Sequence, residues 1–94
     1  MAISIKEILT KLPLHPGIYK YFNKADELIY VGKAKNIKKR VTSYFSKIHA
    51  DSKTRSLVNQ IEKIEFIVVN SESDALLLEN NLIKTYQPKY NILL

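Results

Sequence analysis

The segment GIYKYFNKADELIYVG, residues 17–32, contains two short runs rich in Ile, Tyr, Phe and Val on either side of a polar link, Lys24-Ala25-Asp26-Glu27. Two such runs around a polar link predict a β-hairpin. Side chains of a strand alternate between its two faces. In the first strand, Tyr19 and Tyr21 therefore point to one face, and the opposite face takes Ile18, Lys20 and Phe22.

The length of the link decides whether the tyrosines of both strands share a face. A turn of two or four residues places Tyr21 opposite Tyr30 with Tyr19 on the diagonal, and it leaves Phe22, Ile29 and Val31 on the other face. A loop of odd length reverses one strand and separates the phenols. The link lacks glycine, so its turn type stays open. Ordinary β propensity explains three tyrosines as well as a functional site does.

Composition limits the classes of protein to which the chain can belong. With 94 residues, 46% of them hydrophobic, it forms one small domain. The absence of cysteine excludes disulfides and thiolate metal sites and fits a cytoplasmic location. The only histidines, His15 and His49, are not clustered, so zinc is not expected. No apolar run is long enough to cross a membrane, and the net charge of +6 favours a polyanionic partner.

Two helices are predicted around the hairpin. Ser4 and Glu7 have the spacing of a capping box, and apolar residues from Ile5 to Leu12 recur at helical spacing, which predicts a short first helix. Asn36 is a plausible N-cap for the second helix. The apolar stripe of this second helix consists of Ile37, Val41, Tyr44, Phe45 and Ile48.

The second half of the chain adds a strand between two more helices. Residues 54–63 have a helical pattern, and residues 64–69 are dense in β-branched residues with the alternation of a third antiparallel strand. Ser71 begins a second capping signature, and the helix that follows extends to about Tyr86 before Pro88 ends it. These elements predict an α+β domain.

Basic residues follow the hairpin directly. Residues 33–40 contain five cations in eight positions. Lys33 lies at the mouth of the hairpin, and Arg40 lies on the margin of the second helix's apolar stripe, so both are aimed toward the hairpin. Lys38 and Lys39 fall away from the stripe, where a solvated helix face is at least as good an interpretation as contact with a ligand.

Glu79 occupies an unusual place in the last helix. At about 100° per residue, five apolar residues fall within roughly 60° of it, and these are Ala75, Leu76, Leu82, Ile83 and Tyr86. A carboxylate on an inward face is costly unless it is paired, hydrogen-bonded or bound to a cation. Two interpretations remain: a buried ion pair with Lys or Arg, and a metal-binding or catalytic carboxylate.

Phosphodiester hydrolysis uses groups of these kinds. A carboxylate anchors a divalent cation, positive side chains offset the charge that grows on the phosphoryl oxygens, and a base takes a proton from the attacking water. A free tyrosine titrates near pH 10, so a tyrosine acts as a base only with help from nearby positive charge. Lys33 or the metal ion could supply that charge.

Several segments resemble known sequences. Gly17-Ile18-Tyr19 and Tyr30-Val31-Gly32 resemble the paired triplets of the GIY-YIG nuclease family, with valine in place of the second isoleucine. Residues 30–45, 75–84 and 88–91 resemble the branch of that family formed by the N-terminal domains of bacterial excision-repair nucleases. The resemblance implies a three-stranded antiparallel sheet flanked by helices. It also implies a metal-dependent endonuclease that cuts damaged double-stranded DNA on the 3′ side of a lesion in nucleotide excision repair.

The resemblance also implies roles for individual residues. Glu79 would hold one divalent cation, Mg²⁺ or Mn²⁺. Tyr30 would be the candidate general base, and Tyr19 would position water or phosphate, although which tyrosine takes the proton stays open. Arg40 would stabilise the phosphate, and Lys33 would support both the phosphate and the ionisation of Tyr30.

Further residues would complete the site and its DNA contacts. Tyr44 would contact the substrate or shape the pocket, and Asn91 would orient the site from the C-terminal tail. The expected nucleic-acid contacts are the cations after the hairpin, namely Lys33, Lys35, Lys38, Lys39 and Arg40.

The expected partners follow from the same resemblance. Similar full-length proteins carry a segment that docks on a UvrB-type partner, a second nuclease domain and helix-hairpin-helix motifs. The apolar ending Ile92-Leu93-Leu94 predicts that residues 1–94 are the N-terminal fragment of a longer chain, and the domain is expected to be monomeric. Two alternatives stay open. One is a free-standing GIY-YIG homing or structure-selective nuclease, and the other is a basic module that binds nucleic acid without cutting it.

Overall fold

The computed structural model describes residues 5–46 and 48–94. In its sheet, the central strand β1 (Gly17–Phe22) pairs on one side with β2 (Leu28–Ala34) and on the other with β3 (Lys63–Val68). Both pairings are antiparallel. The predicted α+β class with a three-stranded antiparallel sheet is therefore confirmed, and the third strand lies within one residue of its predicted bounds.

The loop between β1 and β2 has an odd length, yet the tyrosines still share a face. Phe22 pairs with Leu28 across the five-residue loop 23–27, whereas Tyr21 pairs with Tyr30, so Ile29 is an extra residue that forms a β-bulge. The bulge compensates for the odd loop and restores the predicted pairing of the phenols. The prediction for Ile29 is wrong, because the bulge moves its side chain into the cluster around the tyrosines.

A side chain fixes the loop that contains no glycine. The Asn23 side-chain oxygen accepts hydrogen bonds from the backbone N–H groups of Ala25, at 3.0 Å, and of Glu27, at 2.9 Å. Asp26 takes the left-handed conformation, with φ of 63°. Asparagine at the start of a turn makes such bonds readily, and aspartate tolerates positive φ better than most residues do.

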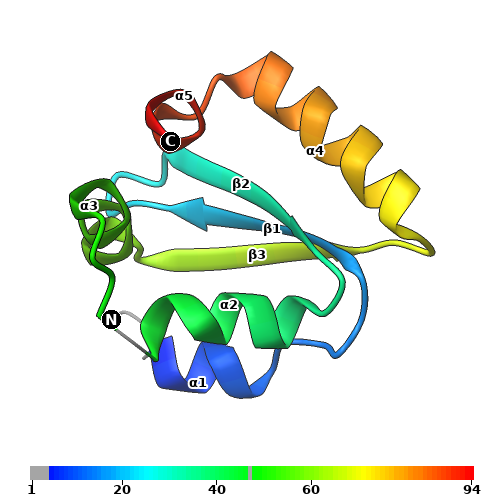
Figure 1. Cartoon of the computed structure of the whole chain (residues 1–94), viewed down its shortest axis with the longest axis horizontal. Coiled ribbons are helices and arrows are strands. Elements are labelled where there is room, and N and C mark those ends of the chain that lie inside the picture. The colour runs from blue at the N-terminus through cyan, green and yellow to red at the C-terminus, as the bar shows by residue number, and fades with distance from the viewer. Residues whose placement is uncertain (1–4, 47) are drawn as a thin grey trace.

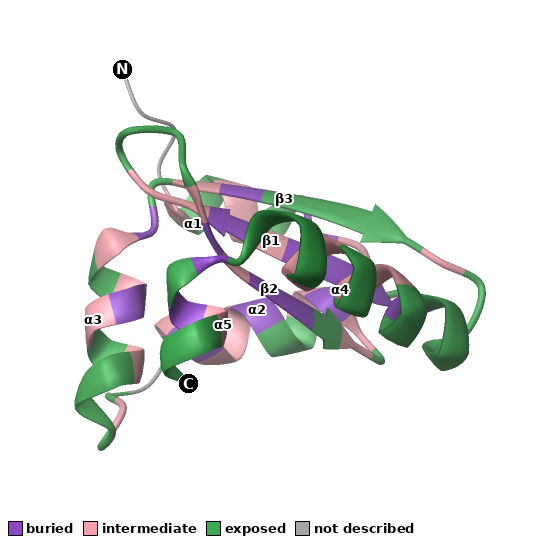
Figure 2. Cartoon of the chain, turned by 90° about the horizontal axis from the view of Figure 1, so that it is seen from above, coloured by how far each residue is buried: buried purple, intermediate pink, exposed green. Residues whose placement is uncertain are grey.

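Helices lie on both sides of the sheet in Figure 1. The short α1 (Ile5–Thr10) and α2 (Ile37–Phe45) lie on one side, and α4 (Glu72–Tyr86) lies on the other. At one end, α3 (Ser52–Gln60) meets α5 (Lys89–Leu93). Burial is concentrated in β1 and β2 and on the inner sides of the helices, whereas most of β3 is exposed (Figure 2).

The helix caps agree with the sequence patterns where the structure describes them. Asn36 accepts a hydrogen bond from the backbone N–H of Lys39 at 3.0 Å, and Ser71 accepts one from Asp74 at 3.2 Å. Both are predicted N-caps. The predicted cap at Ser4 lies outside the described residues. The third helix begins two residues earlier than predicted, because Asp51 caps it, and it ends at Gln60.

Two predicted apolar stripes are shorter in the structure than in the sequence. Helix α2 buries Ile37, Val41 and Tyr44 but ends at Phe45, so Ile48 lies beyond it and is 93% exposed. Helix α4 packs mainly on β2 and β1 and buries only Ala75. Leu76 and Tyr86, which are 46% and 61% exposed, therefore lie off its inward face, contrary to prediction. No helix in the described ranges is long and apolar enough to cross a membrane.

Neither of the two glycines that bracket the hairpin has a positive φ, so backbone conformation does not require glycine at these positions. Glycine is needed because neighbouring groups pack directly against the backbone there. A Cβ on Gly17 would overlap the carbonyl oxygen of Ile67 in β3 and would lie 2.7 Å from Cδ1 of Ile37. A Cβ on Gly32 would overlap the end of the Tyr19 ring, which crosses β2 at that point. Each glycine thus leaves room for a neighbour that carries part of the fold or the site.

Candidate active site

Four tyrosines from β1, β2 and α2 form one cluster. The rings of Tyr19, Tyr21, Tyr30 and Tyr44 have centroids 5.1 to 6.4 Å apart in every pair. The hydroxyls of Tyr19 and Tyr44 lie 3.1 Å apart, within hydrogen-bond distance. Tyr21 is completely buried beneath the others, and its hydroxyl has no hydrogen-bond partner among the described residues.

Arg40 contacts this cluster from one turn earlier in α2. Its guanidinium lies 5.0 Å from the centroid of the Tyr44 ring and donates a long hydrogen bond, 3.4 Å, to the Tyr44 hydroxyl. A guanidinium over an aromatic face is attracted by the ring's negative face. The contact holds Arg40 beside the tyrosines and still leaves most of its N–H donors for a ligand.

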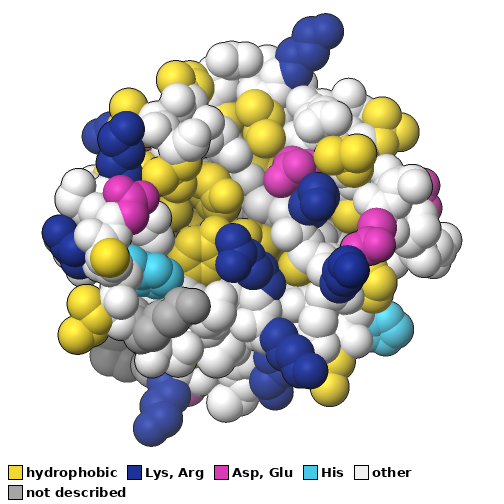
Figure 3. Space-filling view, in the orientation of Figure 1, with side chains coloured by type: hydrophobic (Ala, Val, Ile, Leu, Met, Phe, Trp, Pro, Cys, Tyr) yellow, Lys and Arg dark blue, Asp and Glu magenta, His cyan; other side chains and the backbone are white. Residues whose placement is uncertain are grey.

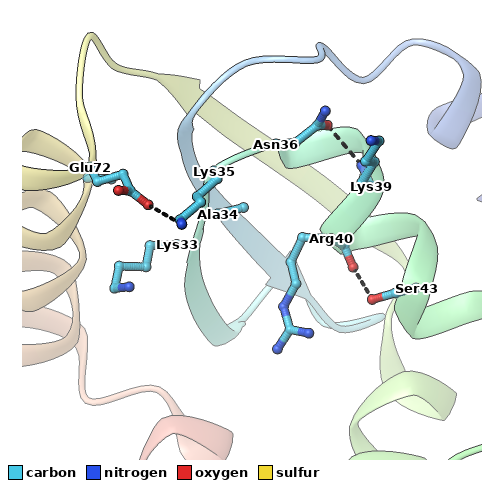
Figure 4. A pocket seen from close by; sticks show the side chains of 9 residues that line it. Lys33, Ala34, Lys35, Asn36, Lys39, Arg40, Ser43 and Glu72 are labelled. Atoms are coloured by element: carbon cyan, nitrogen blue, oxygen red, sulfur yellow. Dashed lines mark hydrogen bonds and ion pairs between the residues drawn. The ribbon is translucent and has the colours of Figure 1, made fainter.

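The cations after the hairpin do not all point the same way. In Figure 4, Lys33 extends from the end of β2 toward α4, and Arg40 extends from α2 into the space between the two helices, whereas Lys39 extends away from that space. Lys35 lies 3.7 Å from Glu72 of α4, and both side chains are largely exposed, so this ion pair contributes little stability. Lys38 is half-buried on the outer side of α2, beside Leu14.

Two adjoining hollows form the site. The first, here called the basic groove, has a volume of about 450 Å³ and is lined by Lys33, Ala34, Lys35, Asn36, Lys39, Arg40, Ser43, Glu72 and Ala75. The second, here called the tyrosine pocket, has about 330 Å³ and is lined by Tyr30, Arg40, Ser43, Tyr44, His49, Thr54 and Leu94. Because Arg40 and Ser43 line both, the hollows meet at these residues. Figure 3 shows hydrophobic side chains, tyrosine included, at the centre of this face, with Lys and Arg around them.

Burial favours the protonated form of three of these phenols. Desolvation is the main cause that raises the pKa values of Tyr19, Tyr21 and Tyr30 above that of free tyrosine. For Tyr30 the neighbouring Tyr44 and the charge of Glu79 raise the pKa further, and Arg40 partly offsets the rise. The cation that acts on the Tyr30 pKa is thus Arg40, and the help predicted from Lys33 stays a prediction. A phenol here becomes a base only if more positive charge is brought to it.

Glu79 lies in the middle of α4, half-buried and close enough for its charge to act on Tyr30. None of the ion pairs in the described part of the chain includes Glu79. The interpretation as a buried ion pair with Lys or Arg therefore finds no support.

The donor set around Glu79 suits one kind of metal ion. Within residues 5–46 and 48–94, no three His, Cys, Asp or Glu residues come together as a metal site. A cation at Glu79 would thus have a single carboxylate and would keep waters as its other ligands. Mg²⁺ is bound in this way by many proteins, through one or two carboxylates, several waters and substrate phosphates. The residues present fit such an ion.

Asn91 contacts the backbone of the strand that carries Tyr30. Its side-chain oxygen accepts a hydrogen bond from the N–H of Val31, and its side-chain nitrogen donates one to the Val31 carbonyl, both at 2.8 Å. Because β2 is an edge strand, the amide takes the place of a neighbouring strand. Val31 lies between Tyr30 and Gly32, so these hydrogen bonds fix the stretch of β2 backbone that carries both residues.

We expect Asn91→Ala to lower the free energy of unfolding by about 1–3 kcal/mol, since two hydrogen bonds are lost. Urea unfolding measures this effect. Asn91→Asp is the matched control, since it keeps the acceptor and loses the donor, and an intermediate loss is expected. Unchanged stability in Asn91→Ala would contradict the role of this amide.

The architecture and the triplets correspond to a known family. The family described as the UvrC-like GIY-YIG domain matches residues 15–92. The chain belongs to this family.

Curated relatives of this UvrC-like GIY-YIG domain are much longer than the chain. It is 63% identical over 90 residues to the UvrABC system protein C of Bacteroides fragilis, a match that covers 96% of this chain and 15% of the relative. It is 64% identical over 87 residues to the protein of the same description from Porphyromonas gingivalis, covering 93% of this chain and 14% of the relative. The chain thus spans less than a sixth of the length of either protein.

Solved structures support the same assignment. The GIY-YIG N-terminal endonuclease domain of UvrC from Thermotoga maritima, bound to its catalytic magnesium, is 38% identical with a TM-score of 0.81, covering 96% of this chain and 98% of that one. A tyrosine-to-phenylalanine point mutant of that domain, bound to its catalytic divalent cation, has a TM-score of 0.82 at 37% identity, covering 96% and 97%. The family and the fold class expected from the sequence are therefore confirmed.

Several residues of the site, among them Tyr21, Ser43, His49 and Thr54, have no predicted role. Tyr21 is placed correctly by strand alternation, but no sequence signal indicates that its ring lies beneath the other phenols. Ser43 lines both hollows, and His49 and Thr54 line the tyrosine pocket. The Nε2 of His49 lies 3.0 Å from the Tyr44 carbonyl, a contact that depends on how the chain turns after α2. Spacing along the sequence does not predict it.

Proposed function

We propose that this domain is a divalent-metal-dependent endonuclease that hydrolyses a DNA phosphodiester and makes the 3′ incision beside a lesion in nucleotide excision repair. One observation carries the proposal: the Glu79 carboxylate is half-buried on α4 near Tyr30, yet it has no Lys or Arg partner within residues 5–46 and 48–94. The expected Lys or Arg partner of an inward carboxylate is missing in the described ranges, and a metal ion can take its place.

The chain's own residues divide the remaining tasks. Arg40 and Lys33 both line the basic groove, where their charges can act on the phosphates of a bound DNA strand. Tyr30 is the candidate base that takes a proton from water, and Tyr19, held at the Tyr44 hydroxyl, can orient that water or a phosphate oxygen. Bound at Glu79, a Mg²⁺ or Mn²⁺ ion would polarise the phosphate and bring the positive charge that a buried phenol needs to ionise.

Nucleic-acid contact is assigned to the cations beside the basic groove. Lys33, Lys35, Lys39 and Arg40 line it, and Lys38 lies on the outer side of α2. Phosphate contacts release counterions, so DNA affinity is expected to fall steeply with added salt. Lys39 points away from Arg40 in Figure 4. Lys38 and Lys39 therefore fit contacts to flanking phosphates better than contacts to the reacting one.

The proposal also covers the binding partners of the domain and its location in the cell. The relatives' names and lengths support an N-terminal domain of a longer excision-repair nuclease that acts in the cytoplasm on damaged double-stranded DNA with a UvrB-type partner. The surfaces that bind that partner would lie outside residues 1–94, and the domain itself would be monomeric. A free-standing GIY-YIG nuclease is less well supported, because the curated matches are to the excision-repair protein.

Metal removal tests the activity. We expect the chain to nick supercoiled plasmid slowly in Mg²⁺ or Mn²⁺, to stop in EDTA and to resume when the metal is restored, as agarose gels would measure. Without the rest of the protein, irradiated and unirradiated plasmid should be nicked alike. Binding of plasmid with no nicking in any divalent metal would instead support the module that binds without cutting.

A further inference from the structure

The tyrosine pocket is lined by more residues than the proposed hydrolysis of a phosphodiester uses. Tyr30, Arg40 and Tyr44 have roles in the proposed reaction, but His49, Thr54 and Leu94, which have none, also line the pocket. These three come from the loop after α2, from α3 and from the end of the chain. Three separate parts of the chain thus close one hollow beside the proposed phosphate site.

Hydrogen bonds fix the wall that His49 forms. Because the Tyr44 carbonyl can only accept, the Nε2 of His49 carries the proton in their 3.0 Å contact. One nitrogen of Arg55 donates to the carbonyls of His49, at 2.8 Å, and of Ala50, at 2.9 Å. The side chain of Lys53 donates to the Leu93 carbonyl at 3.2 Å, which ties α3 to the chain end. The pocket is therefore formed before a ligand arrives.

The lining suits a nucleoside better than a second phosphate. Three rings line the pocket, those of Tyr30, Tyr44 and His49, and Leu94 adds an aliphatic surface. The rings of Tyr44 and His49 are 6.0 Å apart. Aromatic rings stack on bases whatever their identity. The hydroxyls of Ser43 and Thr54 donate to the Arg40 carbonyl and to Asp51, so toward a ligand they can act only as acceptors. Among the described residues, Arg40 is the only lysine or arginine in this lining.

The place where the basic groove and the tyrosine pocket meet determines how a bound DNA strand would run. Arg40 and Ser43 line both the basic groove and the tyrosine pocket. A phosphate held by Arg40 therefore has its attached nucleoside at the mouth of the pocket, while the rest of the strand follows the lysines of the groove. A strand that ran only along the groove would leave the pocket without a ligand.

We propose that the tyrosine pocket binds the nucleoside attached to the phosphate at Arg40, and that the ring of His49 contacts its base. This inference rests on the proposed function only in that the surface binds DNA phosphate. His49 is then a substrate-contact residue, and binding depends on a base being present at one nucleotide position next to that phosphate.

Binding to short oligonucleotides tests this without cutting. The probes are single-stranded hexathymidylate and the same hexamer with an abasic tetrahydrofuran unit at one position at a time, measured by fluorescence anisotropy in EDTA with the whole chain. One stacked base contributes on the order of tenfold in affinity. We expect wild type to bind the hexamer about tenfold tighter than the abasic probe at one position, and nearly equally at the others.

Two variants separate a ring contact from a structural one. His49→Phe keeps the ring and loses the hydrogen bond to Tyr44, whereas His49→Gln keeps a donor and loses the ring. We expect His49→Phe to retain the tenfold preference and His49→Gln to lose it. A preference kept by His49→Gln and lost by His49→Phe would overturn the proposal, and so would no preference at any position in wild type. Neither result depends on nicking, so failure here is distinct from failure of the nuclease assignment.

Discussion

Replacing Glu79 by glutamine should lower metal-dependent nicking by about 10³-fold, equivalent to about 4 kcal/mol of transition-state stabilisation. Glutamine keeps the size of the side chain and removes its charge. Since Glu79 has no ion pair among the described residues, the free energy of unfolding should change by no more than about 0.5 kcal/mol. Nicking rates, urea unfolding and Mn²⁺ binding by electron paramagnetic resonance measure these effects.

Glu72 offers the matched control for this variant. It belongs to the same helix and lines the basic groove, where it pairs weakly with Lys35. Glu72→Gln should bind Mn²⁺ as wild type does and should change nicking by only a few fold. If Glu79→Gln nicked DNA at the wild-type rate, or bound Mn²⁺ as tightly, the metal would have to lie elsewhere and the proposed function would fail.

Gly32→Ala should damage both the fold and the site. The added Cβ would overlap Cζ and Oη of Tyr19. The Tyr19 ring is 1% exposed and packs on Tyr21, Tyr30 and Tyr44, so it cannot move without displacing them. Overpacking of this kind costs about 1–3 kcal/mol. We expect that loss in urea unfolding, together with a fall in nicking of on the order of 10²-fold because the phenols are displaced.

A double-mutant cycle shows whether Tyr19 is the cause. Tyr19→Leu removes the ring atoms that the new methyl group would meet, so Gly32→Ala should cost little more stability in that background. Equal losses in the two backgrounds would mean that the clash is with another group. Gly32→Ala with wild-type stability and wild-type nicking would refute the need for close approach at this position.

Local sequence signals predict much of the fold because they concern neighbouring residues. Asn36 and Ser71 cap the helices that their spacing indicates, and β-branched residues mark the third strand. The pairing of Tyr21 with Tyr30 is also correct, although the loop is odd. No sequence pattern distinguishes an even turn from an odd loop corrected by a bulge at Ile29. Both bring the same tyrosines together, which is why the grouping of the phenols is predicted and the orientation of Ile29 is not.

The sequence predicts which residues belong to the candidate site, but it does not predict the contacts between them. A helical wheel places Glu79 inward, and the structure leaves it half-buried near Tyr30. The same wheel wrongly predicts that Leu76 and Tyr86 face inward, because it contains no information about the packing of α4 on β2 and β1. The bonds between Asn91 and Val31 join residues 60 positions apart, so only the folded chain reveals them.

That separation has a consequence for synthesis in the cell. Proteins emerge from the ribosome N-terminus first, and the strand with Tyr30 is made long before the tail that holds its edge. Until Asn91 leaves the exit tunnel, the outer N–H and carbonyl of Val31 have no partner on the chain. The backbone of β2 at Val31 therefore gains these two hydrogen bonds only after residue 91 has been synthesised.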